Sequence, residues 1–122
     1  MDSTLRIAVF NEKGIVPVTI VHLTGVLDWK THQDFEDRTF EAIAAGADNI
    51  LIDMGGVAFM GSAGIRALHA IAHRIRTARP GGAPGRMALL NPSEAAMRVL
   101  KTVGLDAYFG VHDNLAEALK SF

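Results

Sequence analysis

Residues 49–65, NILIDMGGVAFMGSAGI, are the most informative stretch of the sequence, because a continuous apolar run is followed by glycines and then by a serine. The run Asn49–Met54 has the length and apolar content of a buried central strand. The glycines at 55–56 predict the turn after this strand, because glycine enters turns at little steric cost. Ser62 is a favourable N-cap, and residues 63–78 follow with apolar side chains at helical spacing. The stretch therefore predicts a strand, a turn and a helix.

The chain before this stretch predicts an antiparallel hairpin. Leu5, Ile7 and Val9 alternate with other positions, as expected for a half-buried strand. Residues 11–14 (NEKG) have the composition of a turn. Residues 16–24 are rich in β-branched side chains and predict the second strand of the hairpin.

A helix is expected between the hairpin and the central strand. Thr31 is its predicted N-cap, and Asp34 completes a variant of the capping box. Gly46 is the expected C-terminal stop of this helix. After the predicted helix at 63–78, the glycine- and proline-rich residues 79–85 predict a loop. Residues 86–91 predict another buried strand.

Capping residues also predict the helix that follows 86–91. Asn91 is the expected N-cap, Pro92 occupies the first helical position, and Glu94 closes a capping box. This helix is expected to end at Gly104. The remaining expected elements are a short strand at 108–111 and a terminal helix capped by Asp113 or Asn114.

The expected order is therefore β-β-α-β-α-β-α-β-α. Helices between successive strands require crossover connections, so most of the sheet should be parallel, with the N-terminal pair antiparallel. We expect an α/β protein with a mixed, mostly parallel β-sheet, and residues 1–122 form one domain by size.

The composition excludes several function classes. The chain has 12 Lys+Arg and 13 Asp+Glu, a net charge of −1, so it lacks the broad positive field of a non-specific nucleic-acid binder. With 49% hydrophobic and 20% charged residues it should fold, and without cysteine it has no thiolate metal site or disulfide. No run is long enough for a membrane span, and no secretory signal is recognisable, so a cytoplasmic location is expected.

Patterns for nucleotide or metal chemistry are incomplete. Gly55, Gly56 and the Gly61-x-x-Gly64 spacing lie where a predicted strand passes into a helix, but the lysine of a phosphate-binding loop is missing. His69 and His73 have a spacing that can bind zinc, but no glutamate lies between them as in a helical zinc motif. Both should lie on the polar face of their helix, so neither a cofactor nor a metal site is expected. The other candidates considered, His22 and His112, are interpreted as packing or surface residues.

Two carboxylates, Asp28 and Asp53, follow predicted strands and could suggest acid–base chemistry. No serine–histidine–aspartate spacing or nucleophile elbow accompanies them. Asp28 is better interpreted as helping to start the first helix, and Asp53 as accepting backbone hydrogen bonds in the next turn. The sequence thus predicts no catalytic residues and no enzyme.

Two large apolar residues, Phe59 and Met60, precede Ser62. One of them, most simply Met60, can pack on the first turn of the helix as a hydrophobic staple. The other would then be exposed beside a serine at a helix start. This predicts a small contact surface for a partner.

Three motifs together resemble the STAS domain, the fold of anti-sigma factor antagonists. Residues 51–65 (LIDMGGVAFMGSAGI) are similar to the family's strand, aspartate, apolar pair and serine-containing helix start. Residues 23–28 (LTGVLD) are similar to a second hallmark that opens the first helix. Residues 91–106 are similar to the later turn and helix with its glycine–leucine stop. The resemblance covers nearly the whole chain.

The resemblance implies a protein-binding regulatory module. In antagonists of this family the first serine of the motif, here Ser62, is phosphorylated by an anti-sigma factor that is also a serine kinase. The unmodified antagonist binds that kinase, the phosphorylated form releases it, and a serine phosphatase reverses the modification. No direct nucleic-acid contact and no membrane insertion are implied. The implied partner-binding residues are Asp28, Phe59, Met60, Gly61, Ser62, Ala63, Gly64 and Ile65.

Two positions depart from the family pattern: Gly61 replaces the acid before the serine, and Val26 stands where an acidic residue is common. The first departure could change kinase recognition. An alternative hypothesis is therefore a constitutive STAS subunit of a larger assembly, such as a lipid-transport ABC complex or a stress-signalling particle. A third is a small-molecule or nucleotide sensor that uses the glycine-rich turn.

Overall fold

The computed structural model describes residues 4–122, which form five strands and five helices. The strands are β1 (Leu5–Lys13), β2 (Pro17–Leu27), β3 (Asn49–Met60), β4 (Arg86–Leu90) and β5 (Gly110–His112). The helices are α1 (His32–Ala44), α2 (Ser62–Thr77), α3 (Glu94–Thr102), α4 (Leu105–Tyr108) and α5 (Leu115–Lys120). The element order is as expected except for the additional short helix α4, and no described helix is long and apolar enough to cross a membrane.

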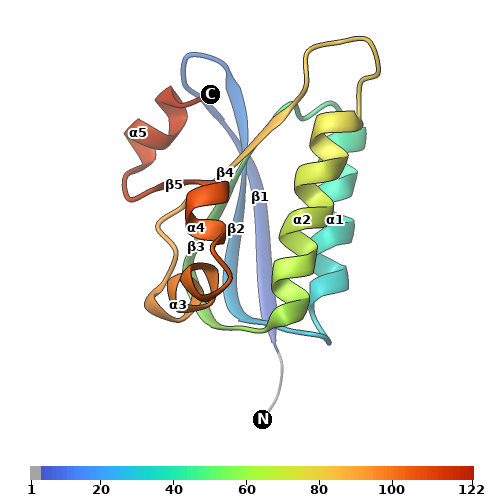
Figure 1. The fold of residues 1–122 in the computed structure, drawn as a ribbon. Coiled ribbons are helices and arrows are strands. Elements are labelled where there is room, and N and C mark those ends of the chain that lie inside the picture. The colour runs from blue at the N-terminus through green and yellow to red at the C-terminus, as the bar shows by residue number, and fades with distance from the viewer. Residues whose placement is uncertain (1–3) are drawn as a thin grey trace.

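One mixed sheet runs in the order β1-β2-β3-β4-β5 (Figure 1). The β1–β2 pair is antiparallel, and the three other pairs are parallel. This confirms the mixed, mostly parallel sheet. The crossovers carry α1 and α2 to the same side of the sheet, where the two helices lie next to each other (Figure 1).

The sheet buries apolar side chains on both faces. On the face under α1 and α2, Leu23, Ile52, Phe35 and Leu68 are fully buried in the main core. Full burial of such a side chain contributes about 1.5–3 kcal/mol. The opposite face is covered by α5, whose Ala118 packs with a smaller group of buried strand residues (Figure 1). That group consists of Val18, Ile20, Leu51, Ala88 and Leu90.

The strand β3 is longer than expected, so the prediction of a turn at residues 55–56 is wrong. Residues beyond Met54 continue to pair with β2, as far as Leu27 opposite Met60, through two register shifts. A Cβ at Gly56 would lie 2.9 Å from the Leu23 carbonyl oxygen, so glycine is what lets the two backbones approach here. Gly56 therefore serves strand pairing instead of a turn.

The turn predicted at 11–14 is also misplaced. Asn11, Glu12 and Lys13 extend β1 and pair with residues at the start of β2, which leaves residues 14–16 as the connection. Continued pairing satisfies backbone groups that a longer loop would leave to water.

At the start of α1, Thr31 is at the N-cap position, but the predicted capping box is wrong. The Thr31 hydroxyl instead donates to the Val26 carbonyl oxygen at 2.7 Å, and no side-chain cap bond forms. An Asp28 carboxylate oxygen accepts from the Lys30 and Thr31 amides at 2.9 and 3.2 Å, which confirms that Asp28 helps to start the helix. At the other end, Gly46 has φ 119° directly after the C-cap, as expected.

The N-cap of α3 is Ser93, and the predictions for Asn91, Pro92 and Glu94 are wrong. The Ser93 hydroxyl accepts from the Ala96 amide at 3.1 Å and donates to the Val57 carbonyl oxygen at 2.6 Å. This second bond reaches β3 and fixes the cap two residues later than expected, so Pro92 precedes the helix and Glu94 is its first residue.

In the C-terminal region the predicted strand at 108–111 is wrong at its start, and the predicted cap of the terminal helix is confirmed. Tyr108 ends the helix α4 and is not in a strand, because β5 begins at Gly110. Leu105, at the start of α4, is buried in the main core, so an apolar contact favours a helical turn here. Asn114 caps α5 by accepting from the Glu117 amide at 3.2 Å, one of the two alternatives predicted.

Candidate partner-binding site

The candidate site lies where the β2–α1 loop meets the β3–α2 connection. Leu27 and Met60 are partners at the ends of β2 and β3, and the Gly61 amide donates to the Leu27 carbonyl oxygen at 2.9 Å. This hydrogen bond holds the segment after Leu27, which contains Asp28, beside the segment that contains Ser62. Two of the three sequence motifs are thereby brought to one end of the sheet.

Gly61 is the N-cap of α2, so the prediction of Ser62 as the cap is wrong by one residue. Gly61 has extended backbone angles (φ −97°, ψ −177°), and its carbonyl oxygen accepts from the Gly64 amide at 3.0 Å. Ser62 is therefore the first helical residue and does not occupy the N-cap position. No side chain caps this helix, and Ser62 is exposed.

The two apolar residues before the cap differ in exposure, as predicted. Met60 is only 2% exposed, whereas Phe59 is 50% exposed. Met60 packs on the first turn of α2, where a Cβ at Gly64 would lie 2.8 Å from Met60 Cγ and 3.0 Å from Leu27 Cγ. Glycine at position 64 thus lets the helix approach the buried ends of β2 and β3, and Met60 is the residue of the pair that packs on the first turn.

The residues implied by the resemblance differ in exposure. Phe59 and Ser62 are exposed, and Asp28, Gly61 and Ile65 are partly exposed. The other three, Met60, Ala63 and Gly64, are buried and position the exposed ones.

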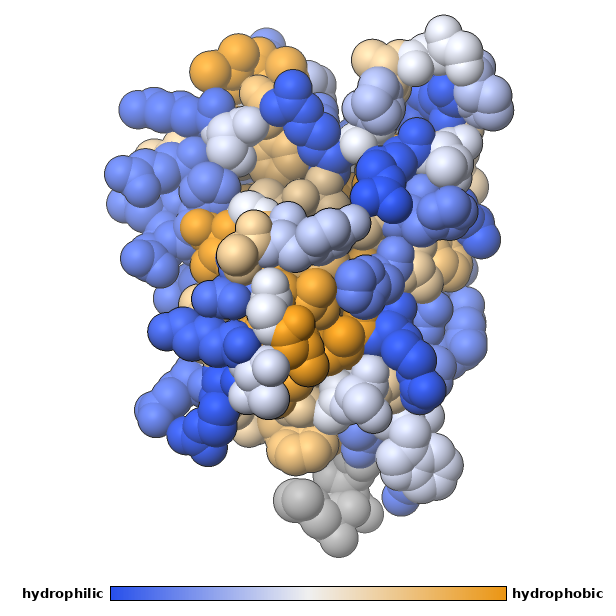
Figure 2. Space-filling model, viewed as in Figure 1, coloured by the Kyte–Doolittle hydropathy of each residue, from blue (hydrophilic) through white to orange (hydrophobic). Residues whose placement is uncertain are grey.

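Further exposed apolar residues extend this surface beyond the sequence prediction. Trp29 is 72% exposed directly after Asp28, and Val103 and Tyr108 are exposed in the α3–α4 region. Figure 2 shows a hydrophobic patch between α2 and the α3–α4 segment, with hydrophilic residues on both sides. An exposed apolar patch rimmed by polar residues is typical of a protein-interaction site. Trp29 is the single tryptophan of the sequence and directly follows the LTGVLD motif at residues 23–28, and this position could have indicated its role.

The outer face of α2 carries only basic and imidazole side chains among its ionisable residues. Residues 62–77 include no aspartate or glutamate. His69 packs against the Tyr108 ring at 5.8 Å between centroids, and an Arg76 guanidinium nitrogen donates to the Tyr108 hydroxyl at 3.3 Å. These contacts join α2 to α4 along the patch. The exposed ionisable side chains of this face are Arg66, His69, His73, Arg74 and Arg76.

The carboxylate of Asp53 has the structural role expected of it. It accepts from the Gly55 amide at 3.1 Å, and its other oxygen lies 2.8 Å from His22 Nδ1. The pairing with His22 across β2 and β3 was not predicted, because it depends on strand register. Within residues 4–122 no group of three or more histidine, aspartate or glutamate side chains is placed to hold a metal ion.

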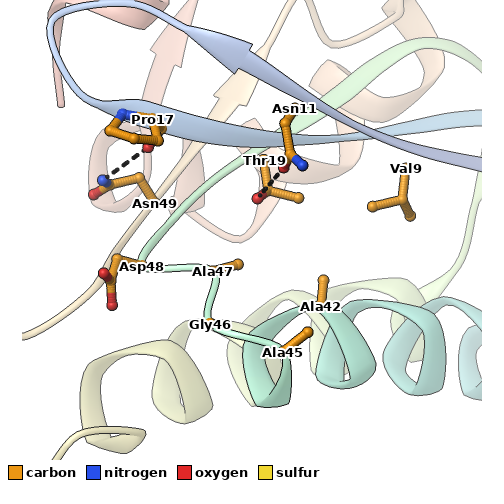
Figure 3. A pocket seen from close by; sticks show the side chains of 10 residues that line it. All are labelled: Val9, Asn11, Pro17, Thr19, Ala42, Ala45, Gly46, Ala47, Asp48 and Asn49. Carbon is orange, nitrogen blue, oxygen red and sulfur yellow. Dashed lines mark hydrogen bonds between the residues drawn. The ribbon is translucent and has the colours of Figure 1, made fainter.

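A groove of about 580 Å³ lies at the other end of the sheet, between the hairpin and the end of α1 (Figure 3). Its polar side chains hydrogen-bond within the wall: Thr19 donates to Asn11 at 3.0 Å, and Asn49 donates to the Pro17 carbonyl oxygen at 3.2 Å. Its lining includes neither the glycines at 55–56 nor Ser62. The groove gives no support to a sensor built on the glycine-rich segment.

The protein is thus a small α/β domain with an exposed serine on the first turn of α2 and an exposed apolar patch between α2 and the α3–α4 segment. The STAS domain model matches residues 10–118, and the chain belongs to the STAS domain family. No curated protein matches the sequence significantly.

Several solved structures share the fold at low sequence identity. An anti-sigma factor antagonist from Mycobacterium paratuberculosis has a TM-score of 0.80 and 24% identity, covering 97% of this chain and 93% of that one. A STAS domain protein from Planctomyces limnophilus has a TM-score of 0.75 and 24% identity, covering 94% and 96%. The phosphorylated form of the Bacillus cell fate determinant SpoIIAA has a TM-score of 0.66 and 23% identity, covering 93% and 98%.

Proposed function

We propose that this protein is a phosphorylation-controlled binding module that, unmodified, sequesters an anti-sigma factor with serine kinase activity. The observation that carries the proposal is the exposure of Ser62 on the first turn of α2, shortly after the exposed Phe59 and the buried Met60. A relative with this fold has been solved in a phosphorylated form, which supports a role for phosphorylation. The module itself is not an enzyme in this proposal and acts in the cytoplasm.

The modification transfers a phosphoryl group from ATP bound to the partner. The Ser62 Oγ attacks the γ-phosphorus, an Oγ–P bond forms, and the bond from that phosphorus to the ADP leaving oxygen breaks. A base of the partner accepts the hydroxyl proton. A serine phosphatase reverses the change by hydrolysis, which returns the hydroxyl and releases inorganic phosphate.

Phosphorylation would act on binding more than on folding. The phosphate adds about −1.5 to −2 charges at an exposed position of a helix N-terminus, where negative charge is tolerated. At an interface formed with Phe59 and Trp29, the same charge would have to lose its water. A loss of about 3 kcal/mol in binding energy would weaken the affinity more than a hundredfold.

The test compares three baits in extracts of the native cell: wild type, protein with phosphoserine incorporated during translation at 62, and protein with phosphoserine at 121. Ser121 is a matched control because it is exposed next to α5, on the other side of the sheet from α2. We expect a kinase-type ATPase on the wild-type and Ser121-modified baits and its loss from the Ser62-modified bait.

A second step uses the captured kinase after purification. It should transfer labelled phosphate from ATP to wild type and leave the Ser62→Ala variant unlabelled. Labelling of Ser62→Ala would place the modification elsewhere. Transport-ATPase subunits held equally by all three baits would instead identify the protein as a constitutive subunit of a larger assembly.

A further inference from the structure

We propose that Arg66 binds the phosphate of phosphorylated Ser62, so that one modification removes both a neutral serine and a free guanidinium from the partner-binding surface. This inference rests on the proposed function, because it concerns the phosphorylated state of Ser62. It assigns Arg66 a role in the change of partner binding that phosphorylation of Ser62 produces.

The helix places the two side chains together. Ser62 and Arg66 are four residues apart in α2, and both are exposed. Side chains with this separation lie one above the other on one helix face, with about 5–6 Å between Cβ atoms. Because helical side chains lean toward the N-terminus, a side chain as long as that of Arg66 can reach over the turn that contains Ser62. A guanidinium can form two parallel hydrogen bonds with a phosphate.

No competing carboxylate holds Arg66. The ion pairs among residues 4–122 do not include it, and α2 has no acidic residue. Two carboxylates in and before the neighbouring α1 already have partners: Asp28 accepts two backbone amides, and Glu36 lies 2.6 Å from His32 Nδ1. The guanidinium is therefore available to a new anion.

The departure at Gly61 favours the same pairing. An acid at this position would place a carboxylate one residue before the phosphate and would repel it. With glycine there, the charged group closest in the α2 sequence to a phosphate on Ser62 is Arg66. An aspartate at position 62 is shorter and has a single negative charge, so Ser62→Asp should reproduce the phosphorylated state only in part.

The experiment uses the full chain with phosphoserine incorporated at position 62 during translation, so that no kinase is needed. Phosphorus NMR follows the phosphate through its second ionisation. Because a cation favours the dianion, the midpoint should be lower by about 0.3 pH units or more than in the Arg66→Gln variant. In nitrogen–proton spectra of the arginine side chains, the Arg66 Nε–H signal should shift on phosphorylation.

Two further variants separate a specific pair from a general effect of charge. Arg66→Lys should keep part of the midpoint shift. Arg74→Gln removes the same charge from the same helix, but its guanidinium lies 4.2 Å from the centre of the Phe40 ring, so the phosphate midpoint should not change. Asp28, His32 and Glu36 are identical in every variant and do not contribute to the differences. Circular dichroism confirms that each variant is folded.

The inference is overturned if Arg66→Gln leaves the midpoint unchanged, or if Arg74→Gln raises it equally. Failure of the proposed function gives a different result: a kinase that does not modify Ser62 leaves this titration as expected, because the phosphate is introduced during synthesis.

Discussion

Replacing Gly64 with alanine sets two energies against each other at the start of α2. Alanine is a better helix former than glycine by up to about 1 kcal/mol, and by less in the first turn. The new methyl, however, would lie 2.8 Å from Met60 Cγ and 3.0 Å from two atoms of Leu27. Both neighbours are at most 2% exposed and cannot move into water.

Overpacking of this kind costs about 1–3 kcal/mol. After the propensity gain, Gly64→Ala should lower the free energy of unfolding by about 0.5–2 kcal/mol, or a few degrees in Tm. Chemical denaturation should show a lower midpoint with an unchanged slope.

Gly82→Ala is the control, because a Cβ there meets atoms of Arg79 only at 3.5 Å or more. A double-mutant cycle with Met60→Ala should show that the cost of the Gly64 change becomes smaller when the Met60 side chain is removed. A Gly64→Ala protein as stable as wild type would refute the described packing of α2 on Met60 and Leu27.

Further predictions concern the caps and the exposed surface. Gly61→Asp should raise the free energy of unfolding by about 0.5–1 kcal/mol in thermal melts, because a carboxylate there can accept first-turn amides; a decrease would contradict the N-cap assignment. Ser62→Ala should change stability by less than about 0.5 kcal/mol, since Ser62 is not a cap. Ser93→Ala should cost about 1–2 kcal/mol, because it removes the α3 cap and the bond to β3; equal effects of the two serine changes would refute this distinction. Trp29→Ala should leave the melting temperature nearly unchanged and weaken capture of the kinase at least tenfold in a binding titration; unchanged affinity would remove Trp29 from the site.

Local sequence patterns were sufficient for the sheet type and for the element order apart from the short helix α4. The alternation of Leu5, Ile7 and Val9 and the apolar run after Asn49 are properties of single strands, so they can be recognised without knowledge of their neighbours. The division of roles between Phe59 and Met60 was predictable for the same reason, because a staple involves one turn of one helix.

Features set by contacts between distant segments were not predictable from these patterns. Gly55 and Gly56 have the composition of a turn but lie within a strand, because β2 pairs with β3 on both sides of a register shift, with Thr24 opposite Gly56. Asn91 and Ser93 are both acceptable caps, and the hydrogen bond from Ser93 to Val57, 36 residues away in sequence, accompanies the observed choice. The pairing of His22 with Asp53 likewise depends on register between β2 and β3.

The length of β3 has a practical consequence for experiments that immobilise or label the protein. A twelve-residue strand spans roughly 40 Å, and Ser62 follows its far end, whereas the C-terminal Phe122 packs near Val16 at the hairpin end. In Figure 1 the C-terminus and the first turn of α2 lie at opposite poles of the molecule. A fluorophore, bead or sensor chip attached through the C-terminus will therefore orient Ser62 and its neighbouring aromatic side chains toward the solution.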